Sequence, residues 1–136
     1  GKRVAAAPTV KRSVIQSSHD IAELFMEELR YEKKEHFKSV MMNTKGEVIS
    51  VETVSIGTLS NTVVHPREVF GSAVRKSAAG VIFVHNHPSG DPKPSEEDIL
   101  TTERLKEGGE ILGIEVLDHI IIGNGKFSSL KAMELL

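Results

Sequence analysis

Apolar residues recur along the chain with two periods, and these periods predict the order of helices and strands. Residues 18–31 and a stretch beginning at Pro66 place apolar side chains three and four residues apart, as one face of a helix requires. A third helix is expected from Ser95 to about Leu112. Apolar stretches of strand length, rich in β-branched residues, lie at 36–42, 47–56, 81–84 and 114–122, and a short strand is expected around Phe127. This alternation predicts an α/β domain with helices packed on a sheet.

Capping and turn residues place the ends of these elements. Residues 17–20 offer helix-capping side chains, and Pro66 suits the first turn of the second helix. Residues 43–46 are expected to form a hairpin turn, residues 57–64 a loop with a short strand, and residues 130–135 a terminal helical turn. We expect two helical faces to be buried: Ile21, Leu24, Phe25 and Leu29 on the first helix, and Val69, Phe70, Ala73 and Val74 on the second.

Composition narrows the chemistry. The chain has no cysteine, so a thiolate metal site, a disulfide framework and a cysteine nucleophile are all excluded. A transition metal must therefore use histidine and carboxylate ligands. The formal net charge of −2 argues against direct binding of nucleic acid by this domain. No apolar run reaches the roughly 18 residues that span a bilayer, and no signal peptide is recognisable, so we expect a cytoplasmic protein.

The richest chemistry lies between the third strand and the third helix. His85 and His87 stand two residues apart at the end of an apolar strand, so their imidazoles project from the same face. Asp98 falls in the first turn of the next helix, from which its carboxylate can reach back toward them. Three protein ligands with an open fourth position for water are typical of a catalytic zinc site. Each part has a plainer interpretation: the two histidines could pair by chance, and Ser95 with Asp98 could simply cap the helix.

The spacing of these residues matches a known motif. His-x-His, seven residues, Ser95, two residues and Asp98 reproduce the JAMM motif of JAB/MPN-domain metalloproteases. The whole stretch from His85 to Asp98 resembles the bacterial RadC family, and the resemblance extends from about Ser18 to the C-terminus. Further similar stretches are residues 58–59, 65–68 and 117–121.

The resemblance implies a mixed sheet flanked by helices, in the cytidine-deaminase-like JAB/MPN fold. It implies a metal-dependent hydrolase that holds one Zn²⁺ through His85, His87 and Asp98, with water as the fourth ligand. The expected reaction is cleavage of a peptide or isopeptide bond in a protein or peptide substrate. Residues 18–136 would form this domain. Residues 1–17 would be a linker, or the remnant of an N-terminal helix-hairpin-helix region found in full-length members.

Two catalytic residues also follow from the resemblance. Ser95 would help to hold the tetrahedral intermediate, and an upstream glutamate would act as general acid and base. Glu35 has the expected place, where the first helix passes into the first strand, although it could instead be a solvated charge in the Glu32–Glu35 run. The alternatives are Glu47, Glu52 and Glu68.

Two other functions deserve comparison. The RadC family carries a DNA-repair label, which makes a repair or recombination accessory domain with a non-catalytic metal site the alternative function. A nucleobase deaminase would need an H-x-E element and a P-C-x-x-C pair, and this chain has neither. Asp118 and His119 interrupt an apolar strand; they could orient a zinc-bound histidine, or equally form a structural pair. His65, before Pro66, is expected to be structural.

Overall fold

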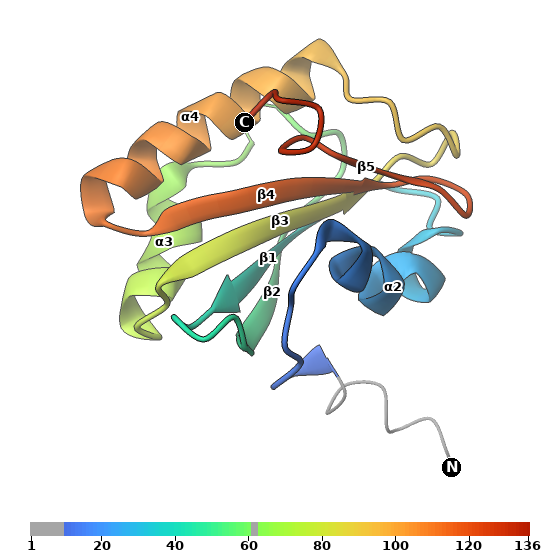
Figure 1. The fold of residues 1–136 in the computed structure, drawn as a ribbon. Helices are drawn as coiled ribbons and strands as arrows, with labels where there is room; N and C mark the ends of the chain where they lie inside the picture. The colour runs from blue at the N-terminus through green and yellow to red at the C-terminus, as the bar shows by residue number, and fades with distance from the viewer. Residues whose placement is uncertain (1–9, 61–62) are drawn as a thin grey trace.

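The protein is built on one mixed β-sheet between two layers of helix (Figure 1). A computed structural model describes residues 10–60 and 63–136. In chain order the elements are helix α2 (Ser18–Leu29), strands β1 (His36–Met42) and β2 (Val48–Ile56), helix α3 (Pro66–Arg75), strand β3 (Gly80–Asn86), helix α4 (Glu96–Leu112), and strands β4 (Glu115–Ile122) and β5 (Phe127–Ser129).

The sheet has the strand order β2-β1-β3-β4-β5. Strand β1 pairs antiparallel with both β2 and β3, and β5 pairs antiparallel with β4. Strands β3 and β4 are parallel, and α4 makes the crossover between them. The α/β class and the mixed sheet expected from the sequence are therefore confirmed.

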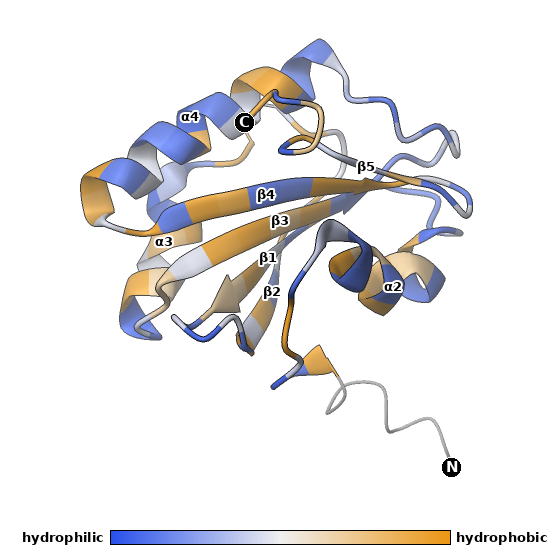
Figure 2. Ribbon diagram, viewed as in Figure 1, coloured by the Kyte–Doolittle hydropathy of each residue, from blue (hydrophilic) through white to orange (hydrophobic). Residues whose placement is uncertain are grey.

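Each face of the sheet carries its own apolar core. Because side chains alternate along a strand, Val81 and Phe83 of β3 pack on the side of α3 and α4, whereas Ile82 and Val84 pack on the side of α2. Figure 2 shows β3 and β4 as mainly hydrophobic strands, as expected for strands that are covered on both faces, with hydrophilic segments at the end of β3 and in the middle of β4. The end of β3 is consequently held in place by packing on both faces of the sheet.

Several details differ from the sequence-based expectations. Helix α2 ends at Leu29, with Arg30 as its C-cap, two residues before the expected end at Tyr31. Val69, Phe70 and Ala73 are buried as predicted, but Val74 is 55% exposed because it lies on the outer side of the last turn of α3.

Two segments outside the named helices and strands were also predicted: the loop after β2 and the C-terminal residues after β5. Residues 57–60 and 63–64 contain no strand, whereas the predicted loop also includes Asn61 and Thr62, which lie outside the described residues. Residues 130–134 form hydrogen-bonded turns, and the Met133 N–H donates to the Ser129 carbonyl at 3.1 Å, so the expected terminal helical turn is present. These turns are closed by a backbone hydrogen bond of 2.9 Å from the Leu135 N–H to the Leu130 carbonyl.

The segment before α2 touches the sheet in its described part. Val14 forms an isolated antiparallel bridge with Glu47, and the Arg12 N–H donates to the Val48 carbonyl at 2.7 Å. The predicted domain boundary at residue 18 stays a prediction, but residues 12–15 pair with the β1–β2 hairpin. Among the helices of the described residues, none is long and apolar enough to cross a membrane.

Candidate metal centre

The predicted ligands converge where β3 ends and α4 begins. His85 lies in β3, and the ladder continues one residue beyond it, because the His87 N–H donates to the Ile122 carbonyl at 2.9 Å. His85 and His87 therefore project from the same face, with ring centroids 4.9 Å apart. Ligand atoms of His85, His87 and Asp98 all lie within 4.8 Å of one another. The structure thus brings together the three residues that the sequence suggested.

Asp98 is positioned by the cap of helix α4. The Ser95 side chain accepts a hydrogen bond from the Asp98 N–H at 3.0 Å, and the Asp98 carboxylate accepts one from the Ser95 N–H at 2.8 Å. This capping box leaves both carboxylate oxygens turned toward the histidines. Oδ2 lies 3.0 Å from His87 Nε2, and Oδ1 lies 3.4 Å from His85 Nε2. Ser95 and Asp98 therefore cap the helix and, at the same time, leave the Asp98 carboxylate in position to bind a metal.

The loop between the ligands is held against the β4–β5 turn. Gly90 adopts a φ of 89°, which favours glycine, and its carbonyl accepts a hydrogen bond from the Asn124 N–H at 2.9 Å. The Ser128 hydroxyl donates to the Pro92 carbonyl at 2.7 Å. These contacts set the separation between His87 and Asp98 even though no regular element joins them.

The charge states of His87 and Asp98 favour each other. The hydrogen bond to Asp98 raises the pKa of His87 above its ordinary value, against the effect of burial. Burial alone would raise the pKa of Asp98, but the hydrogen bond to His87, the nearby His85 and the Ser95 N–H outweigh it and hold that pKa well below its usual range. Asp98 is therefore a carboxylate at neutral pH, as a metal ligand must be.

The buried nitrogen of His85 indicates that the site fits a cation. Among the described residues, His85 Nε2 is buried and has no hydrogen-bond partner. Its nearest carboxylate oxygens, on Asp98 and Glu35, lie 3.4 Å and 3.5 Å away, which is too long for a strong hydrogen bond. Buried polar atoms are almost always paired, so an unpartnered nitrogen facing two carboxylates and a second imidazole suits a divalent metal.

Glu35 lies beside the three ligands. Its Oε1 is 3.5 Å from His85 Nε2 and accepts a hydrogen bond from the Leu59 N–H at 3.3 Å. Interaction with the His85 ring lowers the pKa of Glu35, and the Leu59 N–H reinforces the effect. The carboxylate is therefore ionised at neutral pH and able to accept a proton.

The segment that carries Glu35 is fastened by the residue between the two histidines. Asn86 points to the opposite face of β3, where its side-chain oxygen accepts a hydrogen bond from the His36 N–H at 2.7 Å. Its amide group donates to the Lys34 carbonyl at 3.1 Å. Both peptide groups that flank Glu35 are thus tied to the ligand strand, a role that the sequence analysis did not assign.

The other upstream glutamates have different surroundings. Glu47 accepts a hydrogen bond from Asn43 at 2.8 Å, Glu52 accepts one from the Ser72 hydroxyl, and Glu68 lies in the first turn of α3. Glu35 is the member of the four whose contact with a candidate ligand is observed. Its catalytic role stays a prediction, and so does that of Ser95.

The ligands open onto a cleft of about 700 Å³. It is lined by Glu35, Thr58 and Leu59 together with residues 87–89 and 95–98. Because His87, Ser95 and Asp98 border the same space as Glu35, a bound molecule can reach the proposed base, the helix cap and two of the three candidate ligands at once, whereas His85 is fully buried behind them.

Two further residues contact the site, and the sequence identified only one of them as a candidate. His119 is fully buried, and its Nε2 lies 2.9 Å from His85 Nδ1. The Thr102 hydroxyl lies 2.6 Å from His119 Nδ1 and donates to the Asp98 carbonyl at 2.7 Å. Burial lowers the pKa of His119 well below its ordinary value, so this ring is neutral. Thr102 follows Asp98 by four residues on the same helical face, a signal that the sequence did contain.

Asp118 and His65 have structural surroundings. Asp118 accepts hydrogen bonds from the Ser129 hydroxyl at 2.6 Å and from the Lys131 N–H at 3.0 Å, which anchors the turn after β5. His65 occupies the N-cap position of α3, and Arg104 lies 3.4 Å from its ring. Of the pair Asp118 and His119, only the histidine contacts a candidate ligand among the described residues.

The comparison with known proteins agrees with this architecture. Residues 15–135 match the family model described as RadC-like JAB domain, and the chain belongs to this family. It is 57% identical to a UPF0758 protein of Desulforamulus reducens over 136 residues and 54% identical to one of Moorella thermoacetica, in both cases over 100% of this chain. It is 53% identical to a UPF0758 protein of Bacillus cereus over 96% of this chain.

The chain spans about three fifths of the length of these relatives: 60%, 59% and 58% respectively. Their names state no activity. The family match supports the fold and is compatible with the group of candidate metal ligands.

Proposed function

We propose that this domain is a metal-dependent hydrolase that cleaves a peptide or isopeptide bond. The observation that carries the proposal is the convergence of two imidazole nitrogens and one carboxylate within 4.8 Å, with a second carboxylate, Glu35, 3.5 Å from the buried His85 nitrogen. A purely structural metal would need no ionised carboxylate beside its ligands and no open cleft.

The donor set of two histidines and one aspartate favours Zn²⁺, which we propose as the single resident ion. When bound, such a metal supplies a Lewis acid that acidifies a water molecule and polarises a carbonyl group. The chain's own part is to hold His85 and His87 on a rigid strand and Asp98 on a helix cap, with an open side toward the cleft.

Glu35 supplies the proton transfer in this proposal. It accepts a proton from the attacking water while the water oxygen bonds to the carbonyl carbon. It then donates that proton to the amine nitrogen as the carbon–nitrogen bond breaks. Its lowered pKa keeps it unprotonated before the reaction, and the Leu59 N–H keeps its carboxylate turned into the cleft.

Ser95 has a hydrogen left to donate. Its oxygen accepts the Asp98 N–H as part of the helix cap, which leaves the hydroxyl hydrogen available to the substrate. We propose that this hydroxyl donates to the carbonyl oxygen as negative charge develops there. The substrate class we propose is a protein or peptide, with no direct role for nucleic acid in this domain.

The test compares the chain with its Glu35→Gln variant. Both proteins are loaded with Zn²⁺, their metal content is measured by elemental analysis, and each is incubated with a peptide library prepared from a bacterial proteome. Mass spectrometry of new amino termini should reveal products from the unaltered chain that chelation abolishes. The Glu35→Gln variant should bind zinc normally but cut at least about 100 times more slowly, the usual loss for a general base.

A contradictory result is equally clear. If the zinc-loaded chain yields no products beyond those of Glu35→Gln, the site is not hydrolytic toward peptides. If, in addition, cells that carry His87→Ala or Glu35→Gln show the same phenotype as cells with the unaltered gene, an accessory function without catalysis is supported instead.

A further inference from the structure

The two histidine ligands are oriented by different means. The His87 ring places its Nδ1 2.9 Å from the Asp91 backbone carbonyl. A carbonyl only accepts hydrogen bonds, so it holds a proton on Nδ1 and makes Nε2 the nitrogen that gives up its proton when a metal binds. The Nδ1 of His85 instead faces the ring nitrogen of His119, at 2.9 Å. An imidazole can donate or accept, so this contact alone does not decide which nitrogen of His85 carries the proton.

Thr102 resolves the ambiguity. A threonine hydroxyl has one hydrogen, and here that hydrogen is donated to the Asp98 carbonyl at 2.7 Å. At 2.6 Å from His119 Nδ1, the same oxygen must therefore act as the acceptor, which places a proton on His119 Nδ1. His119 is fully buried and packs against two phenylalanine rings, surroundings that favour an uncharged ring with a single proton. With that proton on Nδ1, its Nε2 is a lone pair. It accepts from His85 Nδ1, and His85 Nε2 is left free to bind a metal.

The His119 ring is also held in place sterically. It makes edge contacts with Phe37 and Phe83, whose ring centroids lie 5.6 Å and 6.3 Å away at interplanar angles of 88° and 82°. His119 is fully buried, and its backbone is paired with Phe83 in the parallel β3–β4 ladder. The ring can therefore neither swing out to solvent nor exchange its partner for water.

We propose that His119 and Thr102 are positioning residues that hold His85 in the Nδ1-protonated form and so present its Nε2 lone pair to the metal. The inference rests on the metal site of the proposed function but not on hydrolysis. In this proposal Thr102 selects the tautomer of His119, and His119 in turn selects the tautomer of the ligand His85. The chain of contacts returns to the backbone carbonyl of Asp98, so the same four residues tie two of the three ligands together.

The decisive test separates the two tautomers in the metal-free protein. Nitrogen-15 NMR of the histidine rings distinguishes protonated from unprotonated ring nitrogens directly. In the unaltered chain, His85 should carry its proton on Nδ1. In Thr102→Val, which keeps the shape but removes the hydroxyl, His119 loses its acceptor and can move its proton to Nε2. His85 should then shift toward the Nε2-protonated form, and Thr102→Ser should restore the original pattern.

Zinc affinity, measured by competition with a chromophoric chelator, provides the second readout. Thr102→Val and His119→Phe should each weaken Zn²⁺ binding about 10- to 100-fold, the usual loss for a group that orients a ligand. His119→Gln should retain most of the affinity, because its amide oxygen can still accept from His85 Nδ1. Val74→Ala, on the exposed side of α3, is the control and should leave the affinity unchanged.

The outcomes are separable from those of the hydrolase test. If Thr102→Val keeps both the His85 tautomer and the zinc affinity of the unaltered chain, the positioning role is wrong, whatever the hydrolytic activity. If both change as expected and no peptide is cut, the positioning role stands and hydrolysis fails. His119→Phe is accepted as evidence only when its circular dichroism spectrum matches that of the parent chain. Thr102→Val and Thr102→Ser decide the matter if His119→Phe does not fold.

Discussion

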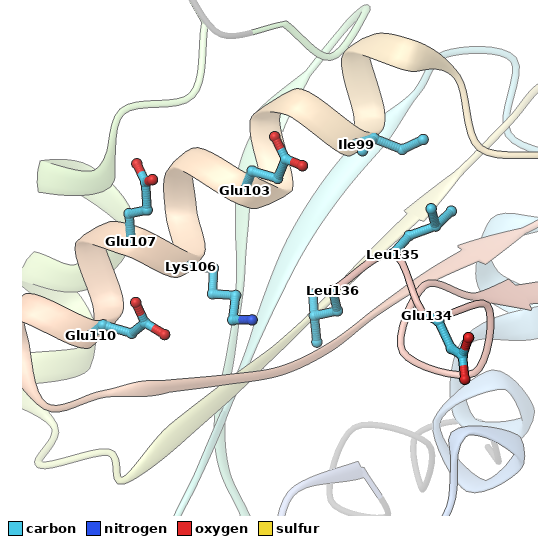
Figure 3. A pocket seen from close by; sticks show the side chains of 8 residues that line it. All are labelled: Ile99, Glu103, Lys106, Glu107, Glu110, Glu134, Leu135 and Leu136. Atoms are coloured by element: carbon cyan, nitrogen blue, oxygen red, sulfur yellow. The ribbon is translucent and has the colours of Figure 1, made fainter.

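Two concave regions border helix α4, and they differ in how their polar side chains are arranged. The first is the metal cleft at the start of the helix, about 700 Å³ in volume. The second, of about 490 Å³, lies along the helix against the last residues of the chain (Figure 3). Both have acidic linings: Glu35, Glu96, Glu97 and Asp98 in the first, and Glu103, Glu107, Glu110 and Glu134 in the second.

Only the first region brings its side chains together. In Figure 3 the carboxylates of Glu103 and Glu107 project from α4 away from Glu134. Within the described residues, the second region contributes no group of three metal-ligating side chains as close as those of the cleft. Volume and acidity are therefore poor guides to chemistry here. The distinguishing features are a strand end, a helix cap and buried partners that force several polar atoms toward one point.

The largest expected effect tests that convergence directly. His87→Ala removes a ligand and also the hydrogen-bond partner of Asp98, so stoichiometric zinc binding should be lost. Elemental analysis of the purified variant measures the effect. Glu107→Ala in the second region is the matched control and should bind as much zinc as the parent chain. Equal metal content in all three proteins would mean that zinc binds elsewhere.

A pH series sharpens the comparison next. The folded pKa of His87 is raised above 6.5, and below that raised value a proton occupies the nitrogen that the metal needs. Zinc affinity should therefore rise with pH through the raised pKa, by about tenfold per unit for each proton released. Isothermal titration calorimetry in buffers of different ionisation enthalpy counts the protons released. No proton release near neutral pH would contradict the assignment of His87.

In the metal-free protein, the contribution of His87 to the free energy of unfolding should fall with rising pH, opposite to the zinc affinity. A raised folded pKa means that the His87–Asp98 pair stabilises the fold fully below the unfolded pKa of His87 and loses its effect as pH rises through the folded value. The depressed pKa of Asp98 adds stability above about pH 4, which is lost as pH falls through the folded value. The lowered pKa of the buried His119 acts against His87 below about pH 6.5, because the unfolded chain then binds a proton that the folded chain excludes. Thermal unfolding should thus give the metal-free protein its highest midpoint near neutral pH, with a loss of stability on the acid side that a variant without His119 should reduce.

A smaller effect is expected from the helix cap. Ser95→Ala removes the acceptor for the Asp98 N–H and should lower the free energy of unfolding by about 1 kcal/mol. Ser95→Asn retains a capping oxygen and should recover most of that loss, as measured by urea denaturation. The hydrolysis assay then separates capping from catalysis. If the Ser95 hydroxyl contacts the substrate, Ser95→Asn should recover stability but hydrolyse peptides as slowly as Ser95→Ala.

The smallest effect belongs to the second region. Glu103→Gln alters an exposed side chain and Lys106→Ala a half-buried one, and neither forms an ion pair within the described residues, so each should change the free energy of unfolding by less than about 0.5 kcal/mol. Zinc affinity should be unaffected in both. A loss of zinc affinity in either variant would show that the two regions communicate along α4.

The sequence was most informative where the structure is local. The His-x-His spacing and the cap at Ser95 depend on strand alternation and on one helical turn, and both are visible in a few consecutive residues. Glu35 could be placed from the resemblance to a family, whereas its contact with His85 depends on how β1 pairs with β3. That pairing joins Phe37 to His85 across nearly fifty residues of sequence.

The partners of the ligands were the harder part. His119 meets His85 because β3 and β4 pair in parallel, with Phe83 opposite His119, and no local pattern specifies that register. The role of Asn86 depends on the same kind of long-range contact, because its partners lie beyond the end of α2. The prediction that Val74 is buried was wrong for a simpler reason. Val74 continues the apolar spacing of α3, but it lies one residue before the helix ends, where no other element of the described chain covers it.

The side chain of Asn86 has a mechanical consequence. It joins the backbone on either side of Glu35 to a residue whose immediate neighbours are the two histidines. If the tip of β3 shifts as the cleft widens or narrows, the anchor of Glu35 shifts by the same amount. The distance between the Glu35 carboxylate and the two histidines should therefore stay nearly constant when the tip of β3 shifts, because both sides of that distance move with the same strand.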